Sequence, residues 1–509
     1  MHHKQRLPRV LAIVAVAALA AYLVPMLRPA PTTEIPNPFP IDRTTQLYPV
    51  RITTLPAPLV RGNGGSLEAV GNDLFLLVRT GQLYHRPEDA DAFRLIDVPP
   101  PLDIAAQTAI RPNPAFGVKS LAITDSDDGL RIYAAHTYLD QDRACNGLAL
   151  SRLALHSAAG GFAPLGTWDT VWRSAPCIPQ TDNALPLASA GAFQIDSDGS
   201  IVLSVGDFGF DGIDYTTDLP VAQDPASDYG KVVRIDPETG AVRHLARGVR
   251  NSSGLAIMSD GRIFEVHHGY RGGDELNLVR EGANYGWPFV TYGARYATYD
   301  WPLSDTPGRH PDFVKPVFAW SPSPAVSALA EADGAEFPLW QGDLLMGSLK
   351  AHTLHRIVFD GNRVVLVEPI EIGARIRDMT VLADGRIAML FDGRPYIGVL
   401  ERRPEVALAG PTEPPDSLKP CAVCHALYPN QPALAAPRLD SILKRAIADG
   451  RGYPYSPALL AHRGERWSEA LMADYLAGRF APGTSMPSQG LSADDIQAVI
   501  DALAGRDSG

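Results

Sequence analysis

Two cysteines and a histidine near the C-terminal end are spaced for one kind of chemistry. They stand in the sequence CAVCH, from Cys421 to His425. In this spacing the two thiols can bond the vinyl groups of a haem, and a histidine ring nitrogen can bind the iron. Haem held in this way transfers single electrons and has no substrate chemistry of its own. We therefore expect Cys421 and Cys424 to attach a haem c covalently and His425 to be an axial ligand.

The segment APGTSMPSQG offers a second iron ligand, Met486, in a loop rich in proline and glycine. This arrangement resembles class I cytochrome c, where a similar loop just before the last helix carries the methionine. The rival, Met472, lies in a helical apolar pattern, so we expect it in the core. Thioether ligation raises the reduction potential, which suits an acceptor of electrons drawn from a substrate.

The residues around these motifs have a helical composition. The segments LDSILKRAIADG and WSEALMADYLAG precede a final LSADDIQAVIDALAG, in which Ser492 is the expected N-cap and Asp495 follows three residues later. The apolar residues of that last segment recur on one helical face. We expect residues 421–509 to form a small all-α cytochrome c domain behind a proline-rich linker, 404–420.

A second group of chemically suggestive residues lies far upstream, between Gly248 and Pro288, in GVRNSSGLAIMSDGRIFEVHHGYRGGDELNLVREGANYGWP. It contains an arginine beside an amide, then glycine-rich turns, then the acidic pair Asp274–Glu275. Glycine-rich backbone with nearby carboxylates suits a hard cation such as Ca²⁺. Arginine suits a planar, multiply anionic ligand. An ordinary hairpin with surface charges would contain the same features.

This segment closely resembles the glucose/sorbosone dehydrogenase family, which includes the soluble-type PQQ-dependent aldose dehydrogenases, six-bladed propellers. The family pattern GLRNPQGLA…EHGPRGGDELNLI…GKNYGWP aligns almost continuously with it. GSLKAHTLHRI (347–357) and ARIRDMTVLADGRIAML (374–390) agree as well. The resemblance implies PQQ and calcium as cofactors, and a sugar or a related alcohol or aldehyde as the substrate.

The resemblance also assigns roles to individual residues. The positions that match contacts to the quinone or to its carboxylates are Arg250, Asn251, Lys350, Arg375 and Arg377. The positions that match calcium ligands are Gly269 and Tyr270, through their carbonyl oxygens at the catalytic ion, and Glu275 and Tyr285 at a second, structural ion. Because PQQ is a tricarboxylate, a group of cations would offset its charge.

The chain departs from the family at the residue that removes the sugar's hydroxyl proton. The family has a histidine in a pattern like HxGGRLxFGPDG, whereas this chain has ASAGAFQIDSDG, with Ala188 at that position and Leu187 before it. The family's early glutamine also has no counterpart near Ala115–Phe116. Alanine cannot accept a proton.

Three interpretations of this departure remain open. Another group could act as the base, and the candidates are His267, His268 and Asp207. Histidine titrates in a suitable range. Alternatively, the substrate differs and needs no base at that place, or the propeller binds a ligand without oxidising it.

The elements that would hold this site repeat along the chain. A turn with Gly or Asp, followed by a short alternating apolar strand, recurs six times: 71–78, 128–135, 198–205, 260–266, 341–348 and 384–391. The repeats are about 43 to 81 residues apart, which is enough for a four-stranded blade with its loops. We expect a mainly β chain with a six-bladed propeller over residues 46–403; a sandwich or barrel is the alternative.

The N-terminal segment is built for export. Residues 1–9 are basic, and 18 apolar residues follow from Val10 to Leu27. Such a segment is either a retained membrane anchor, in the form of an N-terminal hydrophobic helix, or a cleaved signal peptide. Residues 28–45 are rich in proline and read as a linker. We expect the basic flank in the cytoplasm and the rest of the chain in the periplasm, anchored at the inner membrane by residues 10–27 if that segment is retained.

Composition limits the partners and the fate of the remaining cysteines. A net charge of −12 argues against nucleic acid as a partner. In an oxidising compartment Cys145 and Cys177 are expected to form a disulfide, which over a 32-residue separation would stabilise by about 3–4 kcal/mol. The alternative is two buried free thiols.

These expectations favour a periplasmic quinohaemoprotein dehydrogenase. Electrons would pass from the substrate through PQQ to haem c and on to a respiratory electron acceptor. The alternative is a catalytically altered propeller that binds a ligand, joined to an electron-transfer cytochrome c. A propeller hydrolase such as a lactonase is the third candidate and ranks last, because it needs a metal-activated water rather than a haem.

Overall fold

The computed structural model describes residues 37–62, 64–102, 104–110, 116–126, 129–179, 188–210, 220–295, 309–403, 414–428, 436–450, 455–482 and 490–506. Several predictions fall outside these residues: the basic flank 1–9, the export segment 10–27, residues 28–36 and 404–413 of the two linkers, Leu187, Ala115 and the iron ligand Met486. Among the residues that are described, no helix is long and apolar enough to cross a membrane.

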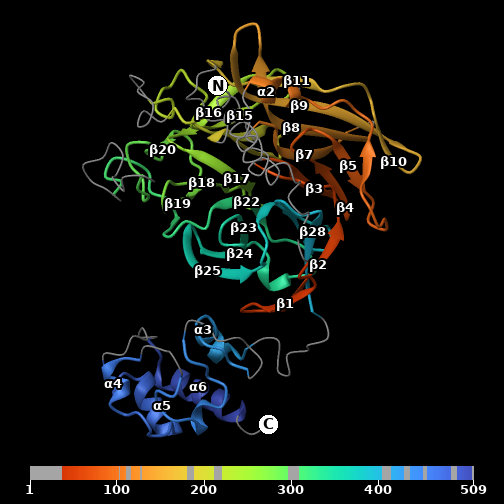
Figure 1. Ribbon diagram of the computed structural model, residues 1–509. Helices are drawn as coiled ribbons and strands as arrows, with labels where there is room; N and C mark the ends of the chain where they lie inside the picture. The colour runs from red at the N-terminus through yellow and green to blue at the C-terminus, as the bar shows by residue number, and fades with distance from the viewer. Residues whose placement is uncertain are drawn as a thin grey trace, which may run out of the picture. The chain divides into compact units, whose positions relative to one another are not determined.

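The larger part of the described chain forms six β-sheets (Figure 1). The first, in chain order, contains β3 (Ser66–Val70), β4 (Asp73–Leu77), β5 (Leu83–Arg86) and β6 (Arg94–Ile96). The second contains β7 (Val118–Ser126), β8 (Gly129–Asp140), β9 (Cys145–Ala158), β10 (Gly161–Pro164), β11 (Asp169–Arg173) and β12 (Ile178–Pro179). The third contains β13 (Ala190–Ile195), β14 (Ile201–Val205), β15 (Lys231–Ile235), β16 (Val242–Arg247) and β20 (Ala283–Asn284).

The other three sheets are antiparallel throughout, whereas β16 and β20 of the third sheet pair in parallel. One contains β17 (Asn251–Ile257), β18 (Ile263–His268), β19 (Asp274–Leu278) and β21 (Phe318–Trp320), and the next contains β22 (Val326–Glu331), β23 (Leu344–Ser348), β24 (Thr353–Asp360) and β25 (Arg363–Glu371). The last joins β26 (Ile376–Val381), β27 (Ile387–Phe391) and β28 (Tyr396–Arg402) to β1 (Ile41–Thr44) and β2 (Pro49–Pro56). Two short helices lie among the sheets, α2 (Ile104–Ile110) and η2 (Pro338–Trp340).

The first strand of each sheet contacts the first strand of the next, so that β3, β7, β13, β17, β22 and β26 form a closed ring. This arrangement confirms the predicted six-bladed β-propeller. Each of the six repeats seen in the sequence supplies the turn into the second strand of a blade, in β4, β8, β14, β18, β23 and β27. The turns recur once per blade because each blade begins with a hairpin.

Strands from the two ends of the propeller close the ring within one blade. β2 pairs antiparallel with β28, from Val50 opposite Arg402 to Pro56 opposite Tyr396. β1 then pairs with β2 at the edge of the same sheet. The linker predicted over residues 28–45 therefore ends earlier than expected, because Ile41–Thr44 already belongs to the propeller.

Apolar side chains fill the spaces between blades. The second strand of a blade is buried on both faces, as in β14 and β27, where every residue is buried. One core cluster joins the second and third blades around Leu150, Leu203 and Tyr229. The sequences of such strands are continuous apolar runs and do not alternate between apolar and polar residues, because neighbouring blades cover both faces of the strand.

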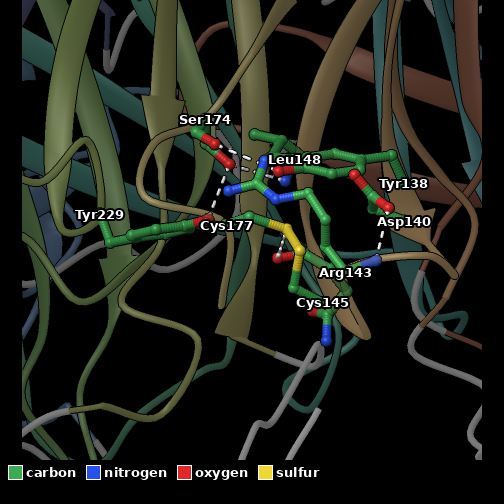
Figure 2. Close-up of a disulfide and its surroundings, with 9 residues drawn as sticks. Tyr138, Asp140, Arg143, Cys145, Leu148, Ser174, Cys177 and Tyr229 are labelled. Carbon is green, nitrogen blue, oxygen red and sulfur yellow. Dashed lines mark hydrogen bonds between the residues drawn. A yellow bond between two sulfur atoms is a disulfide. The ribbon is translucent and has the colours of Figure 1, made fainter. Parts of the chain in front are cut away.

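Cys145 and Cys177 form the predicted disulfide (Figure 2), with a separation of 32 residues in the sequence. It ties β9 to β12 in the second blade, where the two strands pair at Pro179 and Cys145. Nearby, the hydroxyl of Ser174 donates a hydrogen bond of 2.9 Å to the buried Tyr229 hydroxyl, which comes from the loop before β15. The crosslink therefore fixes the edge of the blade where it meets the next one.

The C-terminal region is helical in the residues that are described. Its elements are η3 (Asp416–Leu418), α3 (Lys419–Ala422), η4 (Ile442–Lys444), α4 (Pro457–Leu460), α5 (Glu469–Leu476) and α6 (Ala493–Arg506). The predicted N-cap of the last helix is present: the Ser492 hydroxyl accepts from Asp495 N at 3.2 Å, and the Asp495 carboxylate accepts from Ser492 N at 3.0 Å. Leu418 is buried in the same core as Leu503, so this unit begins a few residues before the predicted position 421.

Candidate functional site: an axial cavity lined by arginines

A cavity of about 430 Å³ lies at the centre of the ring of first strands. The polar side chains that line it include Lys119, Arg250, Asn251, His268, Arg375 and Arg377. Three of these are guanidinium groups, and they come from two blades that are not neighbours in the ring. A cavity with this many fixed cations is suited to a small, multiply anionic ligand.

β-Bulges direct side chains into this cavity. The strand register shifts at Lys119 in β7, at Ser253 in β17 and at Arg377 in β26, and each of these residues lines the cavity. Similar shifts occur in β13 and β22, before Phe193 and Leu329. A bulge adds a residue on one strand and turns its side chain away from the regular alternation. Five of the six first strands of the blades thus have a β-bulge at the cavity.

Arg375 and Arg377 are held by one carboxylate. The Asp392 Oδ2 atom lies 3.1 Å from Arg375 Nε and 3.1 Å from Arg377 Nη2. The Arg375 Nη1 also donates to the carbonyl oxygen of Leu349 at 3.1 Å, and Gly62 N donates to Asp392 Oδ1 at 3.2 Å. Burial lowers the pKa of Arg377 from its usual value, and Asp392 opposes that effect. One carboxylate facing two guanidiniums leaves a net positive charge at this wall of the cavity.

Aromatic rings hold the third arginine. The Arg250 guanidinium lies 4.4 Å from the centroid of Tyr270 and 5.3 Å from that of Trp287. The indole of Trp287 in turn donates to Asp207 Oδ2 at 2.8 Å. Arg250 Nη1 donates to the carbonyl oxygens of His268 and Gly269 at 3.2 and 3.1 Å, while its buried Nε has no hydrogen-bond partner among the described residues. An arginine fixed by rings on one side can present its remaining N–H groups to a ligand.

Two other residues assigned by resemblance occupy different settings. Asn251 begins β17, lines the cavity and accepts a hydrogen bond from Ala190 N at 3.1 Å. Lys350 is exposed and does not line the cavity. Lys350 lies in the turn that follows β23, and its backbone N–H donates to the carbonyl oxygen of Pro324. The structure therefore brings three of the four expected cations together and leaves Lys350 outside.

The position expected for the missing base contains no titratable group. Ala188 is buried, and its carbonyl accepts from Phe208 N at 3.1 Å. Asp207 does not line the cavity; its carboxylate holds Trp287 and accepts from Gly209 N at 2.9 Å. Asp207 thus positions Trp287 and, through it, Arg250, rather than facing a substrate.

The two adjacent histidines differ in their surroundings. His268 lines the cavity, and its burial, together with the charge of Arg250, lowers the pKa to about 4. His267 is buried on the other face of β18, with Nδ1 at 3.0 Å from Glu265 and Nε2 at 3.3 Å from Glu275. Burial opposes its charge, but the two carboxylates outweigh burial and raise the pKa to about 10. His267 is therefore an ion-paired cation, and His268 is a neutral imidazole at neutral pH.

This ion pairing bears on the second calcium position. Glu275 has its carboxylate against His267, and the hydroxyl of Tyr285 donates to the Leu278 carbonyl at 2.6 Å. Among the described residues, no cluster of three or more His, Cys, Asp or Glu side chains is arranged for a metal. Glu275 is paired with His267 in this structure, and the second calcium position at Glu275 and Tyr285 stays a prediction.

The loop expected to hold the catalytic calcium is shaped by backbone carbonyls. A Cβ at Gly269 would lie 2.3 Å from the carbonyl oxygen of Gly272 and 2.4 Å from that of Gly273, so only glycine fits there. Gly269 N donates to Asp274 Oδ1 at 3.0 Å, which fixes the loop. The Gly269 carbonyl points toward Arg250, and Tyr270 packs on the same guanidinium. Backbone carbonyl oxygens are suitable calcium ligands, but the Gly269 carbonyl here accepts a hydrogen bond from Arg250, so the calcium position at Gly269 and Tyr270 stays a prediction.

A second cavity, of about 290 Å³, continues along the axis of the ring. Both cavities are lined by Lys119, Ala192, Ser253 and Arg377. Two carboxyl groups lie in the second cavity. Burial and the nearby Asp378 raise the pKa of Glu68 to about 8, and burial raises the pKa of Asp378 to about 6 despite its bonds from Ser66 Oγ and Leu67 N.

The CAVCH residues line a separate, mostly apolar cavity of about 250 Å³ in the C-terminal unit. Cys421 and Cys424 are free thiols, and both lie at this cavity with His425. The His425 Nδ1 lies 2.6 Å from the Pro437 carbonyl, a bond that leaves Nε2 to bind a metal. Burial lowers the pKa of His425, which favours the neutral ligand form. Met472 also lines the cavity and is buried in the core, as expected.

Fold and site together define a six-bladed propeller with a cation-lined axial cavity. Residues 103–397, more than half of the chain, match the family described as Glucose / Sorbosone dehydrogenase. The chain belongs to this family. The match covers the three arginines that line the cavity, Arg250, Arg375 and Arg377.

Curated relatives match this chain over part of their length. The chain is 35% identical over 213 residues to an uncharacterized protein of Synechocystis, covering 38% of this chain and 51% of that protein. It is 31% identical over 242 residues to the protein named Aldose sugar dehydrogenase YliI of Escherichia coli, covering 44% of this chain and 61% of that protein. The chain thus spans about half to three fifths of the length of these relatives.

Solved structures show the same fold. A glucose dehydrogenase crystal structure, 25% identical, has a TM-score of 0.56 and covers 69% of this chain and 99% of its own. The PQQ-bound form of an aldose sugar dehydrogenase from Streptomyces coelicolor, 20% identical, has a TM-score of 0.51 and covers 72% of this chain and 100% of its own.

Reasoning from the sequence missed two charged residues of the cavity, Lys119 and Asp392. Lys119 stands in VKSLAI, an apolar strand in which a lysine at an inner position is the only signal. Asp392 follows β27 directly and resembles an ordinary turn residue. Neither position belongs to the motifs that carry the family resemblance, so the fold was needed to place them in the cavity.

Proposed function

We propose that the propeller binds PQQ in the axial cavity and oxidises a sugar or a related alcohol or aldehyde. The observation that carries this proposal is that Arg250, Arg375 and Arg377, from two blades, line one cavity together with Asn251. Relatives named as an aldose sugar dehydrogenase and a quinoprotein glucose dehydrogenase support the same class of substrate and cofactor.

The arginine side chains of the cavity would act mainly as positive charges that are already fixed in position before an anion binds. Arg375 and Arg377 are fixed by Asp392, and Arg250 is fixed by its two rings, so none of them needs to reorganise when an anion binds. When bound, PQQ supplies a quinone that accepts two electrons, calcium polarises its carbonyl, and haem c accepts electrons one at a time. The carbonyl oxygens of Gly269 and Tyr270 are the proposed ligands of the catalytic calcium ion.

We also propose that residues 421–509 act as a cytochrome c. The support is local: two free thiols and a neutral histidine line one apolar cavity, and Pro437 holds the histidine ring in the tautomer that can bind iron. Cys421 and Cys424 would carry the haem, and His425 would bind its iron. Met486 remains the proposed second iron ligand.

The proposed location is the periplasm, with residues 10–27 as a membrane anchor or a cleaved signal peptide and residues 1–9 as a cytoplasmic flank. The Cys145–Cys177 disulfide supports a compartment outside the cytoplasm, because thiols are kept reduced inside it. Residues 28–45 and 404–420 would act as linkers, apart from the residues already placed in β1, η3 and α3. The electron acceptor would be a respiratory protein or quinone.

Reconstitution tests the dehydrogenase proposal. The purified full chain is loaded with PQQ and Ca²⁺, a panel of aldoses, aldehydes and alcohols is added, and the haem absorption is followed. Substrate-dependent reduction of the haem supports the proposal. A variant with Cys421 and Cys424 replaced by alanine is the control, since it should reduce a soluble dye acceptor but show no haem signal. No PQQ binding in the wild type would contradict the proposal at its first step.

A catalytically altered binding module is the second candidate. It is favoured by one observation, that Ala188 stands at the position of the family's proton acceptor and is buried. PQQ retention without reduction of haem or dye by any substrate in the panel would select this candidate.

A further inference from the structure

A buried lysine that does not line the axial cavity holds a neighbouring loop together. Lys231, the first residue of β15, is 1% exposed, and its Nζ donates to the carbonyl oxygens of Val221 and Tyr229, at 2.8 Å in each case. These two residues lie near opposite ends of residues 220–230, the 220–230 loop. One ammonium group therefore ties both ends of this loop to the start of a blade strand.

Lys231 is mostly protonated at neutral pH. Burial lowers its pKa to about 8, and the carboxylates of Asp224 and Asp228 act against that effect. A charged donor makes stronger hydrogen bonds than a neutral one, and a carbonyl group removed from water is costly without a donor. The loop is therefore organised around a cation that the chain itself supplies.

One end of the loop is also anchored to the second blade. Ala175 N donates to Asp228 Oδ2, and Asp228 N donates to the Ala175 carbonyl oxygen, at 2.8 Å in both cases. Tyr229 follows directly, and Lys231 connects its carbonyl oxygen to that of Val221. The ammonium group thus joins the anchored end of the loop to its other end.

That other end contacts the rings that position Arg250. Ala222 lies in one buried cluster with Tyr270 and Trp287. These are the two rings that lie against the Arg250 guanidinium. Next to Ala222, the Gln223 Nε2 donates to the Trp287 carbonyl oxygen at 2.6 Å. The loop therefore supports the aromatic side of the Arg250 site.

The loop also fixes the backbone that leads into Arg250. The Ala222 carbonyl oxygen accepts from Gly248 N at 3.1 Å, and the Gly230 carbonyl oxygen accepts from Val249 N at 3.2 Å. Gly230 has a φ of +67°, and a Cβ there would lie 2.4 Å from the Ala222 Cβ, so the two ends of the loop pack closely. Both the rings around Arg250 and the residues before it thus depend on the 220–230 loop.

We propose that Lys231 is a positioning residue for PQQ binding, which holds Arg250 in its binding orientation through the 220–230 loop. This role rests on the proposed function, because it takes PQQ as the ligand of the cavity. Without the ammonium group, the carbonyl oxygens of Val221 and Tyr229 lose their shared donor, and the loop can separate from the rings. Arg250 then has its binding orientation for only part of the time, and the affinity for PQQ falls by that fraction.

The affinity of the full chain for PQQ, measured by equilibrium dialysis with Ca²⁺ present, tests this role. Lys231→Met keeps the length of the side chain and removes the ammonium group. The Kd for PQQ should rise about tenfold, as it does when the competent orientation falls to about a tenth of the population. Gln223→Met breaks the contact with Trp287 at a partly exposed side chain and should also raise the Kd. A wild-type Kd in both variants would overturn the proposal.

Arg356→Met is the matched control for a general loss of stability. Arg356 is also a buried cation, 4% exposed, and its Nε lies 2.6 Å from Asp343 Oδ2 in the fifth blade. This variant should lower the urea midpoint and leave the Kd for PQQ unchanged. If Arg356→Met raises the Kd as much as Lys231→Met, destabilisation alone accounts for the effect and the proposal is wrong.

A double-mutant cycle shows whether Lys231 acts through Arg250. Arg250→Lys keeps a positive charge but loses the planar guanidinium that the rings hold. In that background, Lys231→Met should raise the Kd no further. In the Arg375→Lys background, at a guanidinium held by Asp392, Lys231→Met should keep its full effect. Equal effects in the two backgrounds would contradict a route through Arg250.

A readout in the ligand-free protein does not depend on PQQ. In protein labelled with ¹⁵N-arginine, the Nε–H signal absent from Arg250→Lys belongs to Arg250. Its Nε is buried and its guanidinium lies against two rings, so this signal should exchange slowly with water and be shifted by the rings. Lys231→Met should speed the exchange and reduce the shift, because the loop opens more often. An Arg250 signal that Lys231→Met leaves unchanged would overturn the proposal.

Failure of this role differs from failure of the proposed function. A wild type that binds no PQQ would contradict the proposed function and, with it, the part of Lys231 in PQQ binding. A wild type that binds PQQ, with Lys231→Met and Gln223→Met at the same Kd, would overturn the role of Lys231 alone.

Discussion

The most demanding test of the cavity is the loss of the carboxylate that two arginines share. Asp392 has 11% of its side chain exposed and Arg377 has 13%, and the two groups lie 3.1 Å apart. The substitution Asp392→Asn keeps the size of the side chain and an oxygen that can accept from Gly62 N. It removes the negative charge that compensates the guanidiniums of Arg375 and Arg377.

The size of the expected loss of stability follows from the burial of Asp392 and Arg377. Removing one partner of a buried ion pair costs about 3–5 kcal/mol, because the other charge is left uncompensated. The Arg375 side chain is 45% exposed and can turn toward water, so Arg377 should account for most of the effect. We expect Asp392→Asn to lower the free energy of unfolding of the cofactor-free propeller by about 3 kcal/mol. Added PQQ should recover part of this loss, because its carboxylates replace the missing negative charge.

Urea unfolding followed by the β-sheet circular dichroism of the cofactor-free protein measures this difference. Asp384→Asn is the matched control in the same blade, where Asp384 Oδ2 lies 2.7 Å from Arg386 Nε but the side chains are 36% and 32% exposed. An exposed pair should contribute less than about 1 kcal/mol. If Asp392→Asn is no more destabilising than Asp384→Asn, the two arginines are not held as described and the charge argument for the cavity is refuted.

Three further predictions concern other parts of the chain. Replacing Cys145 and Cys177 by alanine should cost about 3–4 kcal/mol in urea unfolding, because a 32-residue loop is no longer closed; a thiol reductant should then destabilise the wild type only. Since burial beside Asp378 raises the pKa of Glu68 from 4.5 to about 8, its stabilising contribution is complete below pH 4.5 and is lost as the pH rises through 8. Glu68→Gln should therefore flatten the fall in urea midpoint over that range, and an unchanged slope would contradict it. Cys424→Ser should leave a haem held by one thioether bond, visible as a shifted absorption band of the reduced pyridine complex, while PQQ retention stays at the wild-type level.

The blade number could be predicted because each blade begins with a local signal. A tight turn with Gly or Asp followed by an apolar strand needs only neighbouring residues, as in Asp384–Phe391, and it recurs in all six blades. The edges of the propeller had no such signal. The strand Ile41–Thr44 pairs with residues 49–52, and these residues themselves pair with the strand that ends at Arg402. A pairing across the whole domain leaves no pattern in a short window.

The candidate site was predictable only where a motif carried it. Arg250, Arg375 and Arg377 lie in segments that resemble the family, and the structure brings them to one cavity. Lys350 lies in such a segment too, yet its side chain is exposed. Lys119 was missed because a β-bulge, which no hydrophobic pattern reveals, decides on which side of the strand its amine emerges.

The closure of the ring within one blade has a consequence for how the protein is made. β2 emerges early in synthesis and its partner β28 emerges last among the strands of the propeller, since Val50 pairs with Arg402. Until β28 is available, the early strands have no neighbour on one side, and their exposed backbone groups can pair with another chain. The nascent protein therefore stays vulnerable to aggregation until the last blade has been translated. Conditions that slow translation or export late in the chain should lower the yield of soluble protein more than conditions that slow them early.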